Sequence, residues 1–411
     1  MPSPLCRFCN TLLCHTLVDL GMAPLSNAYL KADDLERAEA FYPLHARVCP
    51  ACRLVQLPEF QSPEQIFGHY AYFSSYSDSW LEHARRYAEA MIERFGFDER
   101  ASVVEIASND GYLLQFFKVR GVPVLGIEPA RNVAAVAQAA GIPTLMKFLG
   151  VATAHELRAQ NHGADLLVGN NVLAHVPDIN DFVGGLKILL NAGGVLTLEF
   201  QHLMRLMQFN QFDTIYHEHF SYLSLLTAEA ILAAHGLRVF DVEEIPTHGG
   251  SLRVFARHEG DETHAITPRV ATLRADEVRF GLEKLETYAA FGEQVRETKF
   301  ALLDFLIEAR REGKTVVGYG APAKGNTLLN YCGVRGDLLA YTVDRSPHKQ
   351  GLFLPGTHIP IFAPEKISET RPDYVLILAW NLKDEIVAQM AHIRDWGGRF
   401  ALPIPHLEVL E

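Results

Sequence analysis

The sequence lacks the features that mark several large classes of protein. No stretch approaches the roughly 20 uninterrupted apolar residues of a membrane-spanning helix, and the N-terminus lacks the basic start and apolar core of a signal peptide. The chain also has no basic run, and its 37 basic and 49 acidic residues give a net charge of -12. This balance argues against a nucleic-acid partner. We therefore expect a cytoplasmic protein that binds neither membranes nor nucleic acids.

Cysteine is scarce outside one region, because five of the six cysteines lie within the first 52 residues. Cys6 and Cys9 form one Cys-x-x-Cys pair, and Cys49 and Cys52 form another. This spacing suits metal thiolates in a reducing compartment better than disulfides, and four thiolates predict a closed, structural zinc site. A redox pair is disfavoured because neither motif follows a strand at the start of a helix. Cys14 is left as a small buried residue or a spare ligand.

The clearest fold signal lies in residues 102–128, where a strand, a polar turn, a helix and a second strand ending in Glu128 follow one another. Such a unit binds nucleotides at the helix N-terminus, with the acid on ribose hydroxyls. The turn lacks the Gly-x-Gly-x-x-Gly pattern of a pyrophosphate site, which argues against NAD. Glu105, Asp110 and Gly111 at the turn suit a cationic ligand that carries an amino acid and a ribose, namely S-adenosylmethionine.

Further polar residues follow a later strand at residues 164–168. Asn170, Asn171 and His175 stand just past its end, where parallel sheets bind ligands in the crevice beyond their strands. We therefore expect these three side chains on the ligand side of the sheet.

A hairpin is expected to close this sheet with an antiparallel edge, through strands at residues 237–245 and 251–257. His248, Gly249 and Gly250 lie in its turn. Open backbone N–H groups there could hold an anion, and a hairpin turn alone also explains both glycines.

Residues 267–312 have a helical pattern and connect to another domain. That domain opens with a strand, a Gly-rich turn containing Lys324, and a helix, an arrangement in which backbone amides meet a phosphate. A strand ending at Asp344 completes a second such unit. The chain, with 411 residues and 48% apolar composition, is therefore predicted to be α/β, with two Rossmann-like doubly wound sheets plus a small N-terminal zinc-binding domain.

The densest group of titratable side chains is Tyr216, His217, Glu218 and His219. An extended segment alternates faces and would put the two histidines on one side and the other two side chains on the opposite side. The cluster suits a proton relay, a packed core or a metal site. A hydrolase metal site is disfavoured because ligands two residues apart lack the helical His-Glu-x-x-His geometry.

Six separated motifs share their order with a known family. They are the paired Cys-x-x-Cys motifs, the turn at 105–111, Asn171-Val-Leu-Ala-His175, Tyr216-x-Glu-His219, His248-Gly-Gly250 and Gly318-Tyr-Gly-Ala-Pro-Ala-Lys-Gly325. Over nearly its full length the chain resembles the sugar 3-C-methyltransferases of deoxysugar biosynthesis.

The resemblance implies S-adenosylmethionine-dependent methylation of carbon 3 of a 4-keto-6-deoxy sugar linked to thymidine or guanosine diphosphate. It implies a zinc-binding domain (1–60), a methyltransferase domain (61–265), a helical connection (266–312) and a C-terminal Rossmann-like domain (313–411) that contributes to sugar-nucleotide binding. The active site would lie between the last two domains of a monomer or weak homodimer.

The resemblance also implies residue roles. His219 would be the base that forms an enolate, with Tyr216 and Glu218 orienting it or the sugar, and with Tyr70 and His175 near the ketone oxygen. The expected cofactor residues are Glu105, Ser108, Asn109, Asp110, Gly111, Glu128, Pro129, Phe148, Asn170 and Asn171. The expected substrate-binding residues are Tyr72, His248, Gly249, Gly250, Lys324 and Asn326.

Other functions stay open at this point. One is a methyltransferase that acts on a different small keto substrate. Another is an NAD-dependent sugar-nucleotide oxidoreductase, for which Asp344 offers the acid, although Pro322-Ala-Lys324 crowds the dinucleotide path. A non-catalytic zinc scaffold would leave the convergent polar strand ends unexplained.

Overall fold

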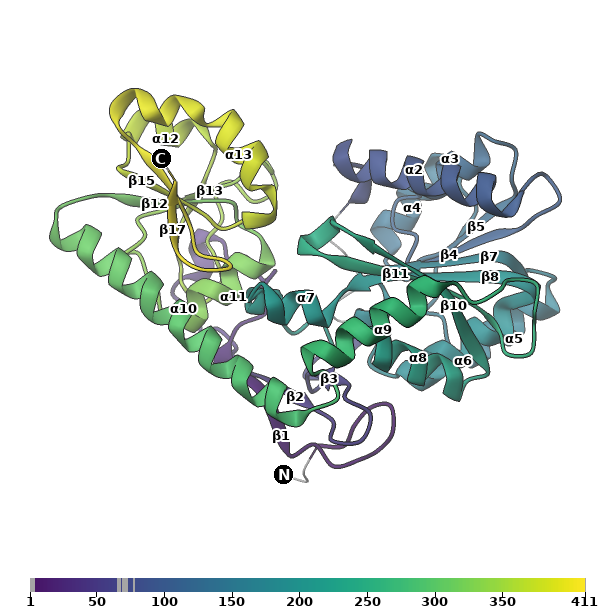
Figure 1. Ribbon diagram of the computed structural model, residues 1–411. Helices are drawn as coiled ribbons and strands as arrows, with labels where there is room; N and C mark the ends of the chain where they lie inside the picture. Colours follow the sequence, from purple (N-terminus) through teal and green to yellow (C-terminus); the bar gives the residue numbers. More distant parts are fainter. Residues whose placement is uncertain (1–3, 65–67, 69–72, 77, 411) are drawn as a thin grey trace.

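The computed structural model describes residues 4–64, 68, 73–76 and 78–410, which form three sheets (Figure 1). The smallest sheet has four antiparallel strands in the order β1-β2-β3-β9. Its last strand comes from the middle of the chain, so the N-terminal domain is completed by a distant segment. The strands are β1 (His15–Ala23), β2 (Tyr42–Val48), β3 (Val55–Gln56) and β9 (Ser221–Tyr222).

The largest sheet has seven strands in the order β10-β11-β8-β7-β4-β5-β6. Strands β4 to β8 run parallel, and β11 pairs antiparallel with both β8 and β10, so the expected antiparallel edge is confirmed. The strands are β4 (Val103–Ile106), β5 (Val124–Ile127), β6 (Thr144–Leu145), β7 (Ala164–Asn170), β8 (Leu190–Gln201), β10 (Leu237–Ile245) and β11 (Ser251–His258).

Helices cover both faces of this sheet, as in a doubly wound fold, with α2, α3 and α4 on one face and α5, α6 and α8 on the other (Figure 1). Helix α2 buries Ala84, Tyr87, Ala88 and Met91, whose spacing of three and four residues forms one apolar stripe. The helices are α2 (Asp78–Phe95), α3 (Leu114–Lys118), α4 (Arg131–Ala139), α5 (Val151–Ala159), α6 (Ile179–Leu189), α7 (Leu203–Gln208), α8 (Leu225–Ala234) and α9 (Pro268–Phe280).

The C-terminal sheet has the order β14-β13-β12-β15-β16-β17, and only β17 is antiparallel to its neighbour. The strand order therefore reverses between β12 and β15, as it reverses between β4 and β7 in the large sheet, which confirms two doubly wound sheets. The elements are β12 (Val316–Tyr319), α11 (Ala323–Cys332), β13 (Thr342–Val343), β14 (Ile361–Phe362), α12 (Glu365–Thr370), β15 (Tyr374–Ile377), α13 (Lys383–Gln389), β16 (Arg399–Leu402) and β17 (Glu408–Leu410).

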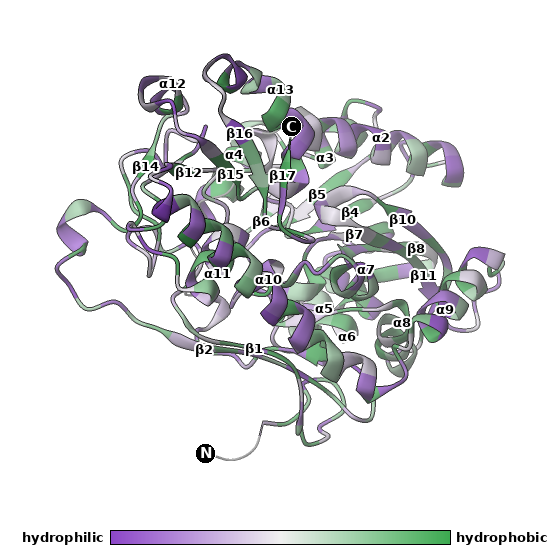
Figure 2. Cartoon of the chain, turned by 60° about the vertical axis from the view of Figure 1, so that its left-hand side comes forward, coloured by the Kyte–Doolittle hydropathy of each residue, from purple (hydrophilic) through white to green (hydrophobic). Residues whose placement is uncertain are grey.

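The 27-residue helix α10 (Leu285–Arg311) runs from the N-terminal sheet to the C-terminal one (Figure 1). It carries both hydrophobic and hydrophilic bands (Figure 2), and its buried positions include Tyr288, Phe291, Val295 and Leu302. One amphipathic helix therefore joins the two outer domains. Among the described residues, no helix has both the length and the apolarity to cross a membrane.

Candidate active site

The carboxyl ends of β4 and β7 lie where the strand order of the large sheet reverses, which is the position of the ligand crevice in doubly wound sheets. The turn after β4 places Ala107 and Asn109 at φ of 56° and 49°, and Asn171 after β7 has a φ of 54°. The Glu128 carboxylate accepts the N–H groups of Asn109 and Ala130 at 2.9 and 2.8 Å. Left-handed backbone at residues other than glycine persists only where its surroundings hold it, and it is frequent at ligand sites.

A second segment packs against this turn from outside the sheet. The 3₁₀ turn Ser74–Tyr76 donates the N–H of Ser74 to the Asn109 side chain at 3.0 Å. The N–H and hydroxyl of Ser75 both donate to Asp110 Oδ2, at 3.1 and 2.6 Å. Tyr70 and Tyr72, expected near the sugar, lie just before this turn and outside the described residues.

Several polar atoms in the crevice have no hydrogen-bond partner among the described residues, although they are buried. They are Glu105 Oε2, Ser108 Oγ, Asp110 Oδ1 and both amide atoms of Asn170. Buried polar groups are normally paired, so this cluster fits a ligand that offers several hydrogen bonds. Burial, reinforced by Glu128, raises the pKa of Glu105 well above its usual value, and burial also raises the pKa of Glu128. A cationic ligand would favour the charged form of both carboxyls and so lower both pKa values again.

Pro129 and Phe148 are two further expected cofactor residues. Pro129 directly follows Glu128, and Phe148 lies on the loop after β6 with 38% of its surface exposed. The crevice thus brings the expected cofactor residues of β4, β5 and β7 to one edge of the sheet, with Phe148 on a separate loop.

The segment from Tyr216 to His219 is a turn and not an extended strand. The N–H of His219 donates to the carbonyl oxygen of Tyr216 at 2.9 Å, and the two rings lie 4.1 Å apart. The expected alternation of faces is therefore wrong, because a turn returns its first and fourth side chains to one side. His217 and Glu218 point elsewhere, toward the N-terminal domain. His217 contacts the carbonyl oxygen of Pro43 at 3.3 Å.

Glu218 likewise faces the N-terminal domain with its side chain. Its carboxylate accepts a hydrogen bond from Asn27 Nδ2 at 2.7 Å, and burial raises its pKa. Its backbone carbonyl, however, accepts from Nδ1 of His175 at 2.8 Å. Glu218 therefore supports the site through its main chain.

His175 and His219 form a pair whose ring centres are 4.8 Å apart. His219 directs Nδ1 to the carbonyl oxygen of Thr214 at 2.9 Å, and His175 directs Nδ1 to that of Glu218. Because a carbonyl oxygen can only accept, each Nδ1 carries the hydrogen and each Nε2 carries the lone pair. Burial lowers the pKa of His219 well below its usual value and that of His175 to about 4. Both rings are thus neutral near pH 7.

The turn between β10 and β11 carries three of the expected substrate-binding residues. His248, Gly249 and Gly250 have φ values of 55°, 86° and 117°, three left-handed residues in a row. Gln211 Nε2 donates to the carbonyl oxygen of Gly249 at 2.7 Å, and the rings of Trp80 and His248 lie 5.1 Å apart. His248 is thereby held in a conformation that an unsupported histidine rarely adopts.

The C-terminal domain reaches the same region through Trp380. Its Nε1 donates to Asp213 Oδ2 at 2.7 Å, and Lys324 Nζ lies 4.2 Å from its ring centre and 2.5 Å from Asn381 Oδ1. Burial raises the pKa of Asp213 to about 6, and burial lowers the pKa of Lys324 to about 8. The structure thus brings Lys324 into a polar cluster between the two doubly wound sheets.

Other parts of the Gly-rich turn after β12 are engaged by the protein itself. The N–H of Ala321 donates to Asp344 Oδ2 at 2.8 Å, and its carbonyl oxygen accepts from Lys349 Nζ at 2.9 Å and from the Tyr29 hydroxyl. Asn326 is buried and donates from Nδ2 to the carbonyl oxygen of Ser26 at 2.7 Å. Asn326 therefore binds the N-terminal domain to α11.

The four cysteines of the paired motifs meet in the N-terminal domain. Their Sγ atoms all lie within 4.8 Å of one another, with Cys6 to Cys52 at 3.6 Å and Cys9 to Cys49 at 3.5 Å. A tetrahedron with Zn–S bonds of about 2.3 Å has edges of about 3.8 Å, so the cluster fits a structural zinc ion. Cys14 is exposed and lies outside this cluster, so both expectations for it, a small buried residue or a spare ligand, are wrong.

A known protein resembles this chain over nearly its full length. The chain is 37% identical to the C-methyltransferase NovU of Streptomyces niveus over 405 residues, which are 98% of this chain and 96% of that protein. This chain belongs to the C-methyltransferase family. Family models match residues 6–67 ("Putative zinc binding domain"), 80–242 ("Methyltransferase domain") and 246–405 ("C-methyltransferase C-terminal domain").

Two solved structures resemble part of this C-methyltransferase. The magnesium protoporphyrin IX methyltransferase of Synechocystis is 13% identical, and 44% of this chain covers 79% of it with a TM-score of 0.34. The 1,6-didemethyltoxoflavin-N1-methyltransferase of Burkholderia thailandensis is 20% identical, and 44% of this chain covers 81% of it with a TM-score of 0.34.

The C-methyltransferase uses S-adenosylmethionine and zinc. The chain offers each of them a different kind of site. The cysteines offer a closed set of four ligands, whereas the crevice after β4 and β7 offers unpaired acceptors and carboxyls to a cation. Zinc therefore stabilises the N-terminal fold.

Several residues beside the site have no role that the sequence analysis predicted. Glu199, buried at the end of β8, accepts from Arg253 Nε at 2.7 Å and faces His83 Nε2 at 3.1 Å, and the His83 ring stacks on Trp80 at 4.9 Å. These partners hold the pKa of Glu199 below its usual value despite its burial. A charged residue within the apolar run of β8 is the signal that could have found this chain of contacts.

Proposed function

We propose that this C-methyltransferase adds a methyl group to carbon 3 of a nucleotide-linked 4-keto-6-deoxy sugar, with His219 as the base. The observation that carries the proposal is the hydrogen bond from Nδ1 of His219 to Thr214, which leaves a lone pair on Nε2 of a neutral ring. The order of motifs shared with sugar 3-C-methyltransferases supports the substrate class.

The chemistry begins with a carbon acid. A ketone at carbon 4 acidifies the hydrogen on carbon 3, so His219 can take that proton at Nε2 and leave an enolate. S-adenosylmethionine, when bound, supplies an electrophilic methyl group. The chain's own task is to hold the sugar so that carbon 3 faces both that methyl group and the imidazole.

The tautomers of His175 and His219 decide which side chains can donate a hydrogen bond to the ketone oxygen. His175, with its hydrogen on Nδ1, presents an acceptor at Nε2 and cannot donate to the ketone oxygen while it is neutral. A tyrosine hydroxyl would then donate the hydrogen bond that stabilises the enolate oxygen. Tyr216, whose ring lies 4.1 Å from that of His219, is our choice among the described residues.

The nucleotide diphosphate is assigned to the cluster around Trp380. Lys324 provides a positive charge there, and His248 stands on the turn that packs against the Trp380 ring. An NAD-dependent reaction is less well supported, because Asp344 accepts the N–H of Ala321 and is not directed at a ribose.

The proposal is tested by incubating the protein and S-adenosylmethionine with a panel of thymidine- and guanosine-diphosphate-linked 4-keto-6-deoxy sugars. Mass measurement should show the gain of one methylene unit with one of them. His219→Asn should lower turnover by about 100-fold or more and leave cofactor affinity intact, since general bases contribute on this scale.

His217→Asn is the matched control, because His217 belongs to the same turn but faces Pro43. It should leave turnover close to that of the unchanged protein. Near-normal turnover of His219→Asn would move the base to His175, and the absence of a mass gain with every sugar would overturn the substrate class.

A further inference from the structure

The first zinc motif contacts the segment that carries His175. Arg7 lies between Cys6 and Cys9, and its Nη1 donates to the carbonyl oxygen of Pro177 at 2.7 Å. Pro177 stands two residues after His175. The guanidinium of Arg7 also donates from Nη2 to the carbonyl oxygen of Leu57. One zinc-motif side chain therefore binds the backbone next to a site histidine.

The same guanidinium contacts the segment that carries His219. Its central carbon lies 5.4 Å from the ring centre of Phe220, the residue directly after His219. The N–H of Phe220 donates to the carbonyl oxygen of Ala174 at 2.7 Å, and Ala174 directly precedes His175. The two histidine segments are thus bonded to each other, and Arg7 touches both.

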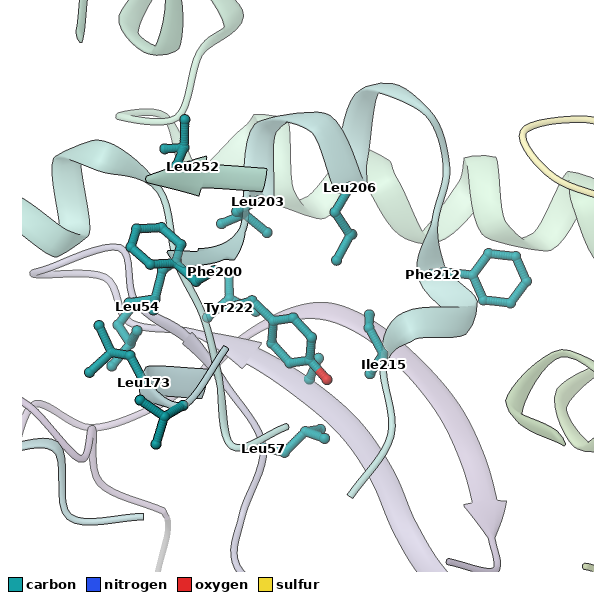
Figure 3. Close-up of a cluster of buried hydrophobic side chains, with 14 of the residues drawn as sticks. Leu54, Leu57, Leu173, Phe200, Leu203, Leu206, Phe212, Ile215, Tyr222 and Leu252 are labelled. Atoms are coloured by element: carbon teal, nitrogen blue, oxygen red, sulfur yellow. The ribbon is translucent and has the colours of Figure 1, made fainter. Parts of the chain in front are cut away.

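The zinc domain is also continuous with the His219 segment through a sheet. Strand β3 pairs with β9, so Val55 lies opposite Tyr222, whose ring centre is 6.0 Å from that of His219. The N–H of Leu57 donates to the carbonyl oxygen of Phe220 at 3.1 Å. Figure 3 shows Leu57 in the same buried cluster as Tyr222.

Gln56 connects this sheet to the metal ligands. Its side chain is buried, and Nε2 donates to Cys6 Sγ at 3.2 Å while Oε1 accepts the N–H of Arg7 at 2.9 Å. The backbone of Gln56 lies opposite Ser221 in β9. Closure of the zinc site therefore fixes Arg7 and Gln56 together.

We propose that the first zinc motif positions His175 and His219 through Arg7, so that the metal domain sets the geometry of proton transfer. Arg7 is a positioning residue, since it acts through Pro177 and Phe220 and not on the substrate. The inference depends on the proposed role of His219. Cofactor affinity is a separate property, because the unpaired acceptors of its crevice belong to the ends of β4 and β7.

Arg7→Lys is the decisive variant. Lysine keeps the positive charge but has no planar fork to bind two carbonyl oxygens and lie on a ring at once. A misplacement of about 1 Å can cost about 100-fold in rate, so we expect kcat to fall by at least about 10-fold. The KM for S-adenosylmethionine should not change.

Arg53→Lys is the matched control. Arg53 directly follows Cys52 in the second zinc motif, and its Nε donates to the carbonyl oxygen of Glu283 at 3.0 Å, away from both histidine segments. This variant should retain kcat, and both variants should retain zinc on metal analysis.

The experiment combines three readouts on the zinc-loaded full chain. They are kcat and KM with a thymidine-diphosphate-linked 4-keto-6-deoxy sugar, calorimetric affinity for S-adenosylmethionine, and NMR signals of ¹³C-labelled histidine rings. Arg7→Lys should lower kcat and shift the signals of His175 and His219, whereas Arg53→Lys should do neither.

The outcomes separate this inference from the proposed function. A fall in kcat with unmoved histidine signals would overturn the positioning role and leave the base assignment intact. Shifted signals with unchanged kcat would support the positioning role and overturn the base assignment. Unchanged kcat and unchanged signals would overturn the inference outright.

Discussion

Gly249→Ala would test whether the contact between Trp380 and the β10–β11 turn matters for substrate binding. Gly249 has a φ of 86°, and a Cβ there would lie 2.6 Å from both the Trp380 ring and Gln211 Nε2. Neither neighbour can move away without losing a hydrogen bond. Trp380 is bonded to Asp213 at 2.7 Å, and Gln211 donates to the carbonyl oxygen of Gly249 itself.

Two costs add up in this variant and can be separated by a control. A left-handed backbone costs alanine about 1–2 kcal/mol relative to glycine, and an inserted methyl group in a packed contact costs about 1–3 kcal/mol more. Gly260→Ala carries the first cost alone, because Gly260 has a φ of 83° and open space where the Cβ would be. The difference between the two variants isolates the contact with Trp380.

We expect Gly249→Ala to lose about 1–3 kcal/mol more unfolding free energy than Gly260→Ala, measured by denaturant titration of the full chain. It should also raise the KM for the sugar nucleotide while leaving S-adenosylmethionine affinity unchanged, because the displaced turn carries His248. Equal stability and equal KM in the two variants would refute the reasoning.

Two further predictions concern charge. Burial lowers the pKa of His219, and a base must be neutral, so kcat/KM should not decline as the pH falls from 8 to about 6.5, the usual histidine pKa. It should decline only below that pH, and an acid limb at or above about pH 6.5 in the rate profile would contradict this. Glu105→Gln should weaken S-adenosylmethionine binding by about 10-fold or more, the scale of a hydrogen bond to a charged group, and should weaken binding of the neutral demethylated product less. Equal losses for both ligands in calorimetry would exclude a charge effect.

The doubly wound class of the two sheets, the turn after β4 and the cysteine cluster could all be predicted, because each follows from a local pattern in the sequence. Apolar runs ended by polar turns located β4, β5 and β7, and the doubly wound rule then placed Glu105 and Asn170 at one sheet edge. Paired cysteine motifs specified the ligands directly. Neither inference needed knowledge of distant contacts.

The turn at Tyr216 could not be predicted, because the side to which each residue points depends on packing against another domain. His217 and Glu218 face Pro43 and Asn27, which lie 174 and 191 residues away along the chain. The bond between Trp380 and Asp213 spans 167 residues. No local periodicity encodes such contacts.

Strand β9 limits how this enzyme can be divided into independently folding fragments. It closes the N-terminal sheet from the middle of the chain, and the bond from Arg7 to Pro177 spans 170 residues. A fragment ending near residue 60 would leave β3 as an open edge, which favours aggregation. Contacts of this sequence separation also form late in folding, because loop closure must precede them. The zinc-binding domain of a relative can therefore replace this one only if strand β9 is exchanged together with it.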